Sequence, residues 1–502
     1  MRCKGSITIF LSLSLTIILS LLFTLLESAR LYGLQSHATM ESQLMLESQM
    51  AQYHLKMYER YGIYLMEANR EGVLSLTEME MEMQNLGMQN LSTGNEADSR
   101  STLNFYELNL TQCHVLQEQL VTDDKGAAFV KLAADRMRSR IVPSITEGLY
   151  RDAKDVQQME ADSGNVDDYI TQADTALNDL GAANQAANEA GQTSSGEETE
   201  EELPEVSLAP DFENPIEYVK DLKNDAILSQ VVGSVASVSQ QKFSKKNDLL
   251  HRDLYEGNYP TADVGATDKL LFREYLLDQF SDYTSPNADN VLQYELEYLI
   301  CGEESDKENL TKVAEKLLAT RELMNYISLH QDPEKVSLAS SMAQAIGGIS
   351  LNPLVIKAIQ EGILASWAYA EAVQDVKLLL NGGKIPLYKT SEDWSSNFQK
   401  ISESTYGEKT ESSLGLDYQD YLRMFLYGTA DKKLAMRTLN LMEQCIRATE
   451  GNGSFRMDCM VSAVTVNWLY EADPLFFGLY GSGAGWNGNY QIMRLERFSY
   501  AQ

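Results

Sequence analysis

The fold of this chain is decided at its amino terminus by residues 5–30, GSITIFLSLSLTIILSLLFTLLESAR. Residues 5–26 carry no charged side chain, which makes an uncharged run of 22 residues. At a rise of about 1.5 Å per residue, a helix of this length measures about 33 Å and can cross a hydrocarbon core of about 30 Å. The sequence therefore predicts a transmembrane helix over residues 5–26.

The charges on either side of the run predict its orientation. Basic side chains within residues 1–4 precede the run, and basic flanks are retained on the cytoplasmic side. We therefore expect a cytoplasmic tail at 1–4, a single-pass location in the cell membrane and an extracytoplasmic position for the bulk of the chain. A cleaved secretory signal is the alternative, but the run is longer than a usual signal core. The nearest candidate cleavage site, Glu27-Ser28-Ala29, also has a carboxylate where a small side chain is expected.

Hydroxyl-bearing residues recur at every fourth position of the apolar run. Because four residues turn a helix about 40° past a full turn, they form a slowly winding ridge of small side chains. Such a ridge lets another membrane helix approach closely and hydrogen-bond across the contact. In the alternative interpretation, each hydroxyl bonds a carbonyl of its own helix and the ridge faces lipid. The candidate packing residues are Thr8, Ser12, Thr16, Ser20 and Thr24.

Composition excludes several classes of protein. The 502 residues include 41 basic and 73 acidic side chains, and a net charge of −32 repels nucleic-acid phosphates. A hydrophobic content of 44% is enough to bury a core. Five cysteines without a Cys-x-x-Cys pair argue against a disulfide scaffold or structural zinc. Cys445 and Cys459 flank a turn signal at Asn452-Gly453, which leaves a disulfide and two buried thiols as alternatives.

The rest of the chain predicts an α+β fold that is predominantly helical. An alternating pattern near the carboxyl terminus indicates an antiparallel strand pair, and a Glu-rich stretch poor in large apolar side chains indicates disorder. The apolar residues of the stem follow no heptad, so we expect a pilin-like stem packed on one domain. The expected parts are a stem helix over 27–67, a helical segment over 68–180, an acidic disordered linker over 181–210, a mainly helical ectodomain over 211–450 and a β-hairpin over 451–502.

Local signals place individual elements within these parts. Ser305 and Glu308 form a capping box, and Pro353 and Gly382-Gly383 bracket another helix. Methionines between 79 and 88 alternate with Glu and Gln at helical spacing, which favours flexible core packing over a thioether metal site. The expected helices cover 111–140, 306–329, 354–380 and 420–448, and the expected strands cover 456–470 and 490–500.

Two parts of the chain resemble known proteins. The opening Lys4-Gly5-Ser6-Ile7-Thr8-Ile9-Phe10-Leu11 and the end of the apolar run resemble the start of pseudopilins from tight-adherence (Tad or Flp-type) pilus systems. The chain is also similar to a Gram-positive family of single-anchor surface proteins with a domain of unknown function. That second similarity lies in stretches 368–376, 382–387 and 392–394, within a region from about 295 to 426. The resemblance implies a non-enzymatic structural component of such a pilus or a related secretion system.

One departure from the pseudopilin pattern refines this expectation. In prepilins a leader peptidase cuts after a glycine, and a glutamate five residues later pairs with the new amine. Gly5 can supply a cut before Ser6, but the fifth residue after Gly5 is Phe10. The run contains no carboxylate to neutralise an amine in lipid, where an unpaired charge is costly. We therefore expect a stationary accessory component rather than a major filament subunit.

Catalytic motifs are missing from the sequence. It contains no Gly-x-Ser-x-Gly and no His-Glu-x-x-His, and its five histidines are scattered. We expect no enzymatic activity, no cofactor, no metal and no small-molecule substrate, with the membrane and other membrane helices or pilus proteins as partners. An anchored hydrolase would need catalytic side chains that meet in space. A ligand-sensing or adhesive surface protein is the other alternative, and a pocket lined by Trp367, Trp394 and Trp486 would favour it.

Overall fold

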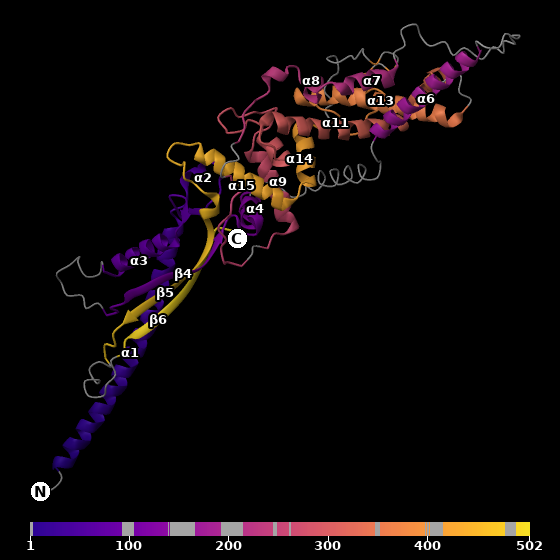
Figure 1. Ribbon diagram of the computed structural model, residues 1–502. Helices are drawn as coiled ribbons and strands as arrows, with labels where there is room; N and C mark the ends of the chain where they lie inside the picture. The colour runs from indigo at the N-terminus through magenta and orange to yellow at the C-terminus, as the bar shows by residue number, and fades with distance from the viewer. Residues whose placement is uncertain are drawn as a thin grey trace. The chain divides into compact units, whose positions relative to one another are not determined.

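The chain has an α+β fold that is mostly helical, as the sequence predicts. It forms two compact units, which are described separately here (Figure 1). Unit 1 consists of Met1–Arg140, Asn247–Phe272 and Leu439–Gln502, and unit 2 consists of Ile141–Lys246 and Arg273–Thr438. This computed structural model describes residues 4–92, 105–138, 140, 166–191, 214–243, 248–260, 263–346, 352–396, 398, 401, 415–476 and 488–501.

Helix α1 (Lys4–Met50) joins the apolar run to the core of unit 1 without a break. From Glu27 onward, buried residues recur every three or four positions, so one face of the helix is covered. The prediction that the stem continues to Glu67 is wrong. The chain turns after Met50, and the Nδ1 of His54 then accepts a hydrogen bond from the Met57 amide to cap a separate short helix, α2 (Leu55–Tyr61).

A four-stranded antiparallel sheet forms the other half of unit 1. Its central strand, β5 (Met460–Ala472), pairs with β4 (Asn109–Leu120) along one side. Along the other side β5 pairs with β6 (Tyr490–Ser499) and the short β1 (Met66–Glu67). The predicted antiparallel pair of carboxy-terminal strands is therefore confirmed, but it belongs to a larger sheet. A small hairpin, β2 (Asn69–Arg70) with β3 (Val73–Leu74), follows β1.

Strand β4 corrects the predicted helix over 111–140. Only its second part is helical, as α4 (Asp123–Arg138). The β4 sequence is rich in Leu and Gln, which favour helices, yet it pairs with β5 along its length and buries Leu110, Cys113 and Leu120. Tertiary pairing therefore outweighs local propensity here. The segment 68–180, expected to be helical, contains three strands among its described residues.

The core of unit 1 lies between the sheet and two helices, α1 and α3 (Leu76–Ser92). In the Met-rich helix α3, Met79 and Met83 are buried in this core, whereas Met81 is exposed. The core-packing interpretation is therefore confirmed for the first two. The core includes Leu34, Met45 and Met50 from α1 and Trp468 and Tyr470 from β5.

Unit 2 is built around α13 (Pro353–Leu380), which packs against α11 (Asp306–His330), α12 (Pro333–Ile346) and α6 (Asp167–Gly191). The predicted capping box is confirmed, since the Ser305 hydroxyl accepts from the Glu308 amide. The side chain of Asn352 caps α13 in the same way. The smaller helices of the described part of this unit are α7 (Pro215–Asn224), α8 (Ile227–Val231), α9 (Ala266–Gln279), α10 (Glu295–Cys301), α14 (Tyr418–Gly428) and α15 (Asp431–Arg447). Of these, α9 and α15 also have residues in unit 1.

Two further boundaries differ from the prediction. The helix expected over 420–448 is interrupted between α14 and α15, because Thr429 is extended and Arg273 donates hydrogen bonds to the carbonyls of Leu426 and Thr429. The acidic linker expected over 181–210 is helical in its first part, since α6 continues to Gly191. The remainder of that linker lies outside the described residues.

Candidate functional site at the junction of the apolar helix and unit 1

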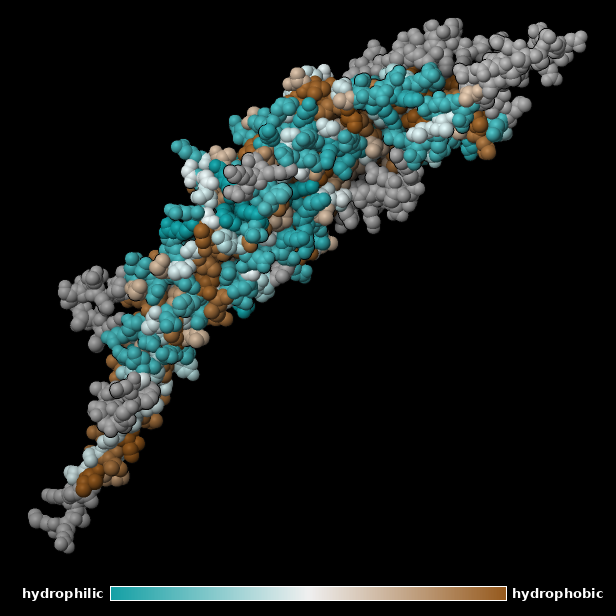
Figure 2. All heavy atoms as spheres, in the orientation of Figure 1, coloured by the Kyte–Doolittle hydropathy of each residue, from teal (hydrophilic) through white to brown (hydrophobic). Residues whose placement is uncertain are grey.

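The amino-terminal half of α1 is uncovered in the structure. Its large apolar side chains from Ile7 to Leu26 are exposed except for Phe23, which is half-buried, and Phe10 is 73% exposed. Figure 2 shows this part of the helix as a brown, hydrophobic surface. Among the described residues, α1 is the one helix that is long and apolar enough to cross a membrane.

The structure places the hydroxyl ridge on this exposed surface. Thr16 donates to the Ser12 carbonyl at 2.8 Å and Thr24 to the Ser20 carbonyl at 2.8 Å. Ser12 itself donates to the carbonyl of Ile9 at 3.0 Å. These hydroxyls therefore bond their own helix, as in the lipid-facing alternative. Thr8 and Ser20 are exposed on the same helix, and the processing candidates Gly5 and Ser6 lie in its first turns.

The two candidate disulfide cysteines are buried thiols. Cys445 lies in α15 and Cys459 lies just before β5, and neither sulfur belongs to a disulfide in the structure. Burial raises the pKa of the Cys459 thiol to about 12. Of the two alternatives left open by the sequence, the structure favours two thiols.

A buried ion pair lies directly after the apolar run. The guanidinium of Arg30 contacts the carboxylate of Glu27 at 3.2 Å, and their exposed fractions are 2% and 0%. The Glu27 carboxylate accepts hydrogen bonds from the backbone amides of Leu475 (3.4 Å) and Phe476 (2.8 Å). Glu27 is therefore held by the loop that follows β5.

Arg30 completes the junction by binding three backbone carbonyls. Its Nε donates to Phe105 at 2.7 Å, its Nη2 donates to Tyr106 at 3.0 Å and its Nη1 donates to Asp473 at 2.7 Å. A planar guanidinium can direct its donors in this way, whereas an ammonium cannot. One turn of α1 thus fixes the segment before β4 and the segment after β5.

A row of aromatic rings runs along the same side of α1. The ring of Phe476 stacks on that of Phe23 with a centroid distance of 5.7 Å and an interplanar angle of 15°. Phe105 lies 6.1 Å from Phe476 and 5.8 Å from Tyr106, whose ring stacks on His37 at 5.9 Å. The row therefore begins inside the apolar run and ends on the covered half of the helix.

Gly33 makes room for this row. A methyl group at Gly33 would lie 2.4 Å from the Cε1 atom of Tyr106, closer than carbon atoms approach in folded proteins. A glycine in the middle of a helix costs about 1 kcal/mol relative to alanine. The close approach of Tyr106 explains why glycine is needed at this position.

Sequence reasoning did not identify the junction. A local signal existed, because Glu27 and Arg30 are three residues apart and lie on one helix face. Their partners Phe105 and Asp473 come from distant parts of the chain, and no local pattern points to them.

Unit 2 contains a second group of buried charges. Arg321 donates to Asp375 and to the hydroxyl of Tyr421, each at 3.0 Å. Lys389 bonds both Asp375 and Glu371. Burial raises the pKa of Glu371, but the Lys389 ammonium and hydrogen bonds from the neighbouring serines outweigh it and lower this pKa to about 2. Each of these charges has a buried partner, so the network ties α11 and α13 to the segment after α13 and has the character of a structural group.

The tryptophans of the ligand-binding alternative are brought together in part. Trp367 and Trp394 both contact the ring of Phe398, at centroid distances of 4.7 and 5.6 Å. The ammonium of Lys335 lies 4.6 Å from the Trp394 ring centroid. Trp486 lies outside the described residues, so the predicted pocket of three tryptophans stays a prediction.

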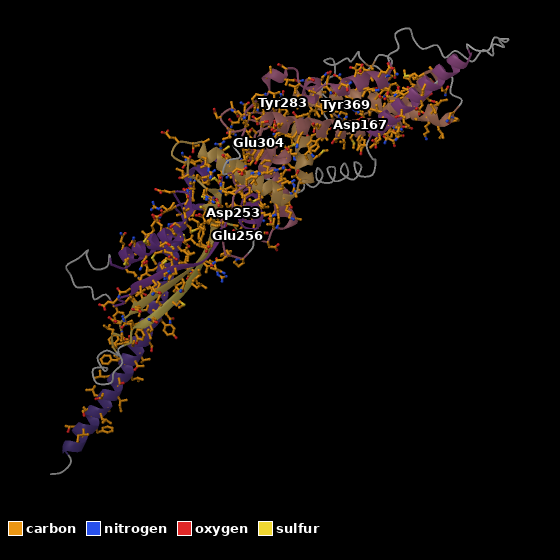
Figure 3. The ribbon with its side chains drawn as sticks, in the orientation of Figure 1. Asp167, Asp253, Glu256, Tyr283, Glu304 and Tyr369 are labelled. Carbon is orange, nitrogen blue, oxygen red and sulfur yellow. The ribbon has the colours of Figure 1, made fainter. Side chains whose placement is uncertain are left out.

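A third cluster joins α6, α7, α11 and α13. The ammonium of Lys223 contacts Asp167 and lies 4.2 Å from the ring centroid of Tyr369 and 3.8 Å from Glu322. Asp167 and Tyr369 are labelled in Figure 3. Burial raises the pKa of Glu322 to about 8, although Lys223 opposes this shift. Across the part of the chain that the structure describes, no group of three or more His, Cys, Asp or Glu side chains could hold a metal ion.

Comparison with known proteins gives one match. The model of a family of unknown function, DUF5702, matches residues 206–472, more than half of the chain. The matched stretch contains most of unit 2 and strand β5, but not α1. No curated protein and no solved structure matches the chain. The expected likeness to a family of unknown function is therefore confirmed, whereas the likeness to tight-adherence pseudopilins stays a prediction.

Proposed function

The chain belongs to DUF5702, a family of unknown function, and from its structure we propose that it is a membrane-anchored, non-enzymatic structural protein of the cell surface. In this proposal residues 5–26 of α1 span the membrane, and both units lie on the extracytoplasmic side. Its role is that of an accessory, pseudopilin-like component of a tight-adherence pilus or a related secretion machine.

The observation that carries the proposal is the continuity of α1. One helix of 47 residues has an apolar, uncovered first half and a second half buried against the sheet of unit 1. Uncovered apolar side chains over more than five turns are costly in water and favourable in lipid. The buried pair of Glu27 and Arg30 lies where the two halves meet.

The same pair supports a retained anchor over a cleaved signal. Cleavage after Ala29 would separate Glu27 from Arg30 and remove the acceptor of the Leu475 and Phe476 amides. Breaking a buried ion pair from one side costs about 3–5 kcal/mol. Because the folded unit 1 uses Glu27 as a buried acceptor, retention of residues 1–29 stabilises it.

The pseudopilin assignment has two supports. The opening of the chain resembles pseudopilins, and a pilin-like stem implies a helix whose outer half packs on a single domain. Helix α1 has this form, since its outer half packs on the antiparallel sheet and α3. Phe10 stands where a filament subunit would carry a glutamate, so the proposal is an accessory role.

The anchor is tested by membrane fractionation, amino-terminal sequencing and external proteolysis of intact protoplasts. We expect the chain to resist carbonate extraction, to begin at Met1 or Ser6, and to lose its two units to protease added outside. A soluble product that begins at Arg30, or units protected from the external protease, would refute the anchor.

The pilus role needs a separate measurement in the source cells. We expect deletion of the protein to reduce surface pili, while sheared filaments from the parent cells contain the major subunit without this chain. Normal pilus number in the deletion strain would refute the accessory role and leave the anchor untouched.

A further inference from the structure

We propose that the base of unit 1 is a lipid-binding surface, at which Phe105, Leu475 and Phe476 enter the outer headgroup layer of the bilayer beside α1. The domain then rests directly on the membrane, with no stalk between them. This inference rests on the proposed membrane anchor, and it adds a second, peripheral contact between the protein and the lipid.

The depth of Phe23 in the membrane carries the argument. Phe23 lies three residues before Leu26, the end of the uncharged run, which places it about 4.5 Å inward along the helix axis. The run of about 33 Å slightly exceeds a hydrocarbon core of about 30 Å, so Phe23 is at the outer boundary of the core. The ring of Phe476 stacks on that of Phe23 with a centroid distance of 5.7 Å, so the two rings lie within 5.7 Å of each other in depth.

Hydrogen bonds at the junction hold the segments before β4 and after β5 directly against α1. Glu27, the first residue after the run, accepts from the Phe476 and Leu475 amides. Arg30, less than one turn further, holds the carbonyl of Phe105. Lifting these loops away from the bilayer would break buried bonds to charged groups, which are among the stronger hydrogen bonds in proteins.

The side chains at this base suit the headgroup layer. Phe105 is 40% exposed and Leu475 is 42% exposed, although both are apolar, and Tyr106 beside them has an amphipathic ring. Aromatic side chains are enriched at this level of membrane proteins. The three proposed contact residues carry no charge, so the surface is suited to zwitterionic phospholipid and does not depend on anionic lipid.

The far end of the same sheet supplies a matched control. Strand β5 has 13 residues, which separates its two ends by roughly 40 Å. Asp473 follows the end at the junction, whereas β1 pairs with the opposite end at Met460. Val73 lies in the small hairpin after β1 and is 55% exposed. A probe at Val73 is therefore on unit 1 but far from the lipid in this proposal.

The test uses the full chain in phosphatidylcholine vesicles and four single variants, Leu15→Trp, Phe105→Trp, Leu475→Trp and Val73→Trp. Quenching by lipids brominated near the headgroup or deep in the acyl chain is measured as the difference from the parent chain, which cancels the native tryptophans. We expect Phe105→Trp and Leu475→Trp to be quenched at least twofold more by the shallow bromines than by the deep ones. Leu15→Trp should show the reverse, and Val73→Trp should not be quenched.

The outcomes separate this inference from the anchor. If Leu15→Trp is not quenched by either lipid, the anchor itself fails. If Leu15→Trp is quenched but the probes at Phe105 and Leu475 behave like Val73→Trp, only the lipid-binding base is overturned. Equal quenching at Val73 would also overturn it, because the lipid contact would not be confined to the base.

A second measurement needs no substitution and so does not depend on the folding of a variant. The unmodified chain is irradiated in vesicles that contain a phospholipid with a photoactivated carbene precursor near the headgroup. We expect labelled peptides from residues 105–106 and 473–476 and none from residues 69–74. Labelling of α1 alone would overturn the proposal.

Discussion

Replacing Arg30 with methionine should loosen the junction between the apolar helix and unit 1. Arg30→Met keeps most of the unbranched side chain and removes the guanidinium, so Glu27 is left as a buried carboxylate without its ion-pair partner. The carbonyls of Phe105, Tyr106 and Asp473 lose their donor in the same change.

The structure sets the size of the effect. Removing one partner of a buried ion pair costs about 3–5 kcal/mol, and each buried acceptor left without a donor costs about 1–3 kcal/mol. These costs overlap, because water can reach the carbonyls of the half-exposed Phe105 and Tyr106 once the loops move. We therefore expect a local loss of about 4 kcal/mol.

Hydrogen exchange of the full chain in vesicles measures this loss where it occurs. The amides of Leu475 and Phe476 donate to Glu27 and report the opening of the junction. Because about 1.4 kcal/mol corresponds to a tenfold change, their exchange should accelerate by roughly three orders of magnitude in Arg30→Met. Arg70, whose side chain is 65% exposed beside Glu78, provides the control: Arg70→Met should change exchange by less than about fivefold.

A double variant tests the cause. In Glu27→Gln with Arg30→Met, the buried charge is gone and the amide oxygen at position 27 can still accept from the Phe476 amide. This double variant should therefore exchange more slowly than Arg30→Met alone. Exchange in Arg30→Met within fivefold of the parent chain, or a double variant that is less stable than the sum of its single changes, would refute the reasoning.

Three further predictions concern other parts of the fold. Gly33→Ala should lower the unfolding free energy by up to about 2 kcal/mol, because the clash of the new methyl group with the Tyr106 ring costs about 1–3 kcal/mol and replacing a helical glycine returns about 1 kcal/mol; a raised melting temperature would contradict this. Burial raises the pKa of Glu297 to about 8, so its folded form keeps a proton that the unfolded chain releases. The stability contribution is full below the ordinary pKa of glutamate and falls by about 1.4 kcal/mol per pH unit up to pH 8, and Glu297→Gln should flatten that slope in denaturant titrations at several pH values. Ser305→Ala should cost about 1 kcal/mol through loss of the cap to Glu308, measured by thermal unfolding of the full chain, and a cost near zero would show that the cap is dispensable.

The elements that sequence analysis predicted well are those whose signals are local. Helix α11 begins at the Ser305 cap and α13 at Pro353, and the strand pair β5–β6 follows an alternating pattern, so each could be identified from adjacent residues. Strand β4 could not, since its partner β5 lies about 350 residues further along the chain. The break at Thr429 depends on Arg273, which lies 156 residues earlier in the chain, so adjacent residues do not reveal it either.

The candidate site was predicted only in its apolar half. The apolar run, the hydroxyl ridge and the charges that follow them are visible in thirty consecutive residues. The contacts that make Glu27 and Arg30 into a junction come from the segments before β4 and after β5, which meet only when the sheet is complete. Sequence analysis therefore interpreted Glu27 as a poor cleavage position, whereas the structure uses it as a buried acceptor.

The central position of β5 has a consequence for the order in which the protein matures. Helix α1 is synthesised first, but the central strand β5, against which it packs, is synthesised only after residue 459. Until then, the apolar face of the second half of α1 and the charged side chains of Glu27 and Arg30 lack β5 and the segment after it, which cover them in the folded protein. Unit 1 therefore cannot close until β5 has been synthesised, and a product that ends before residue 460 would leave this face of α1 open to proteases.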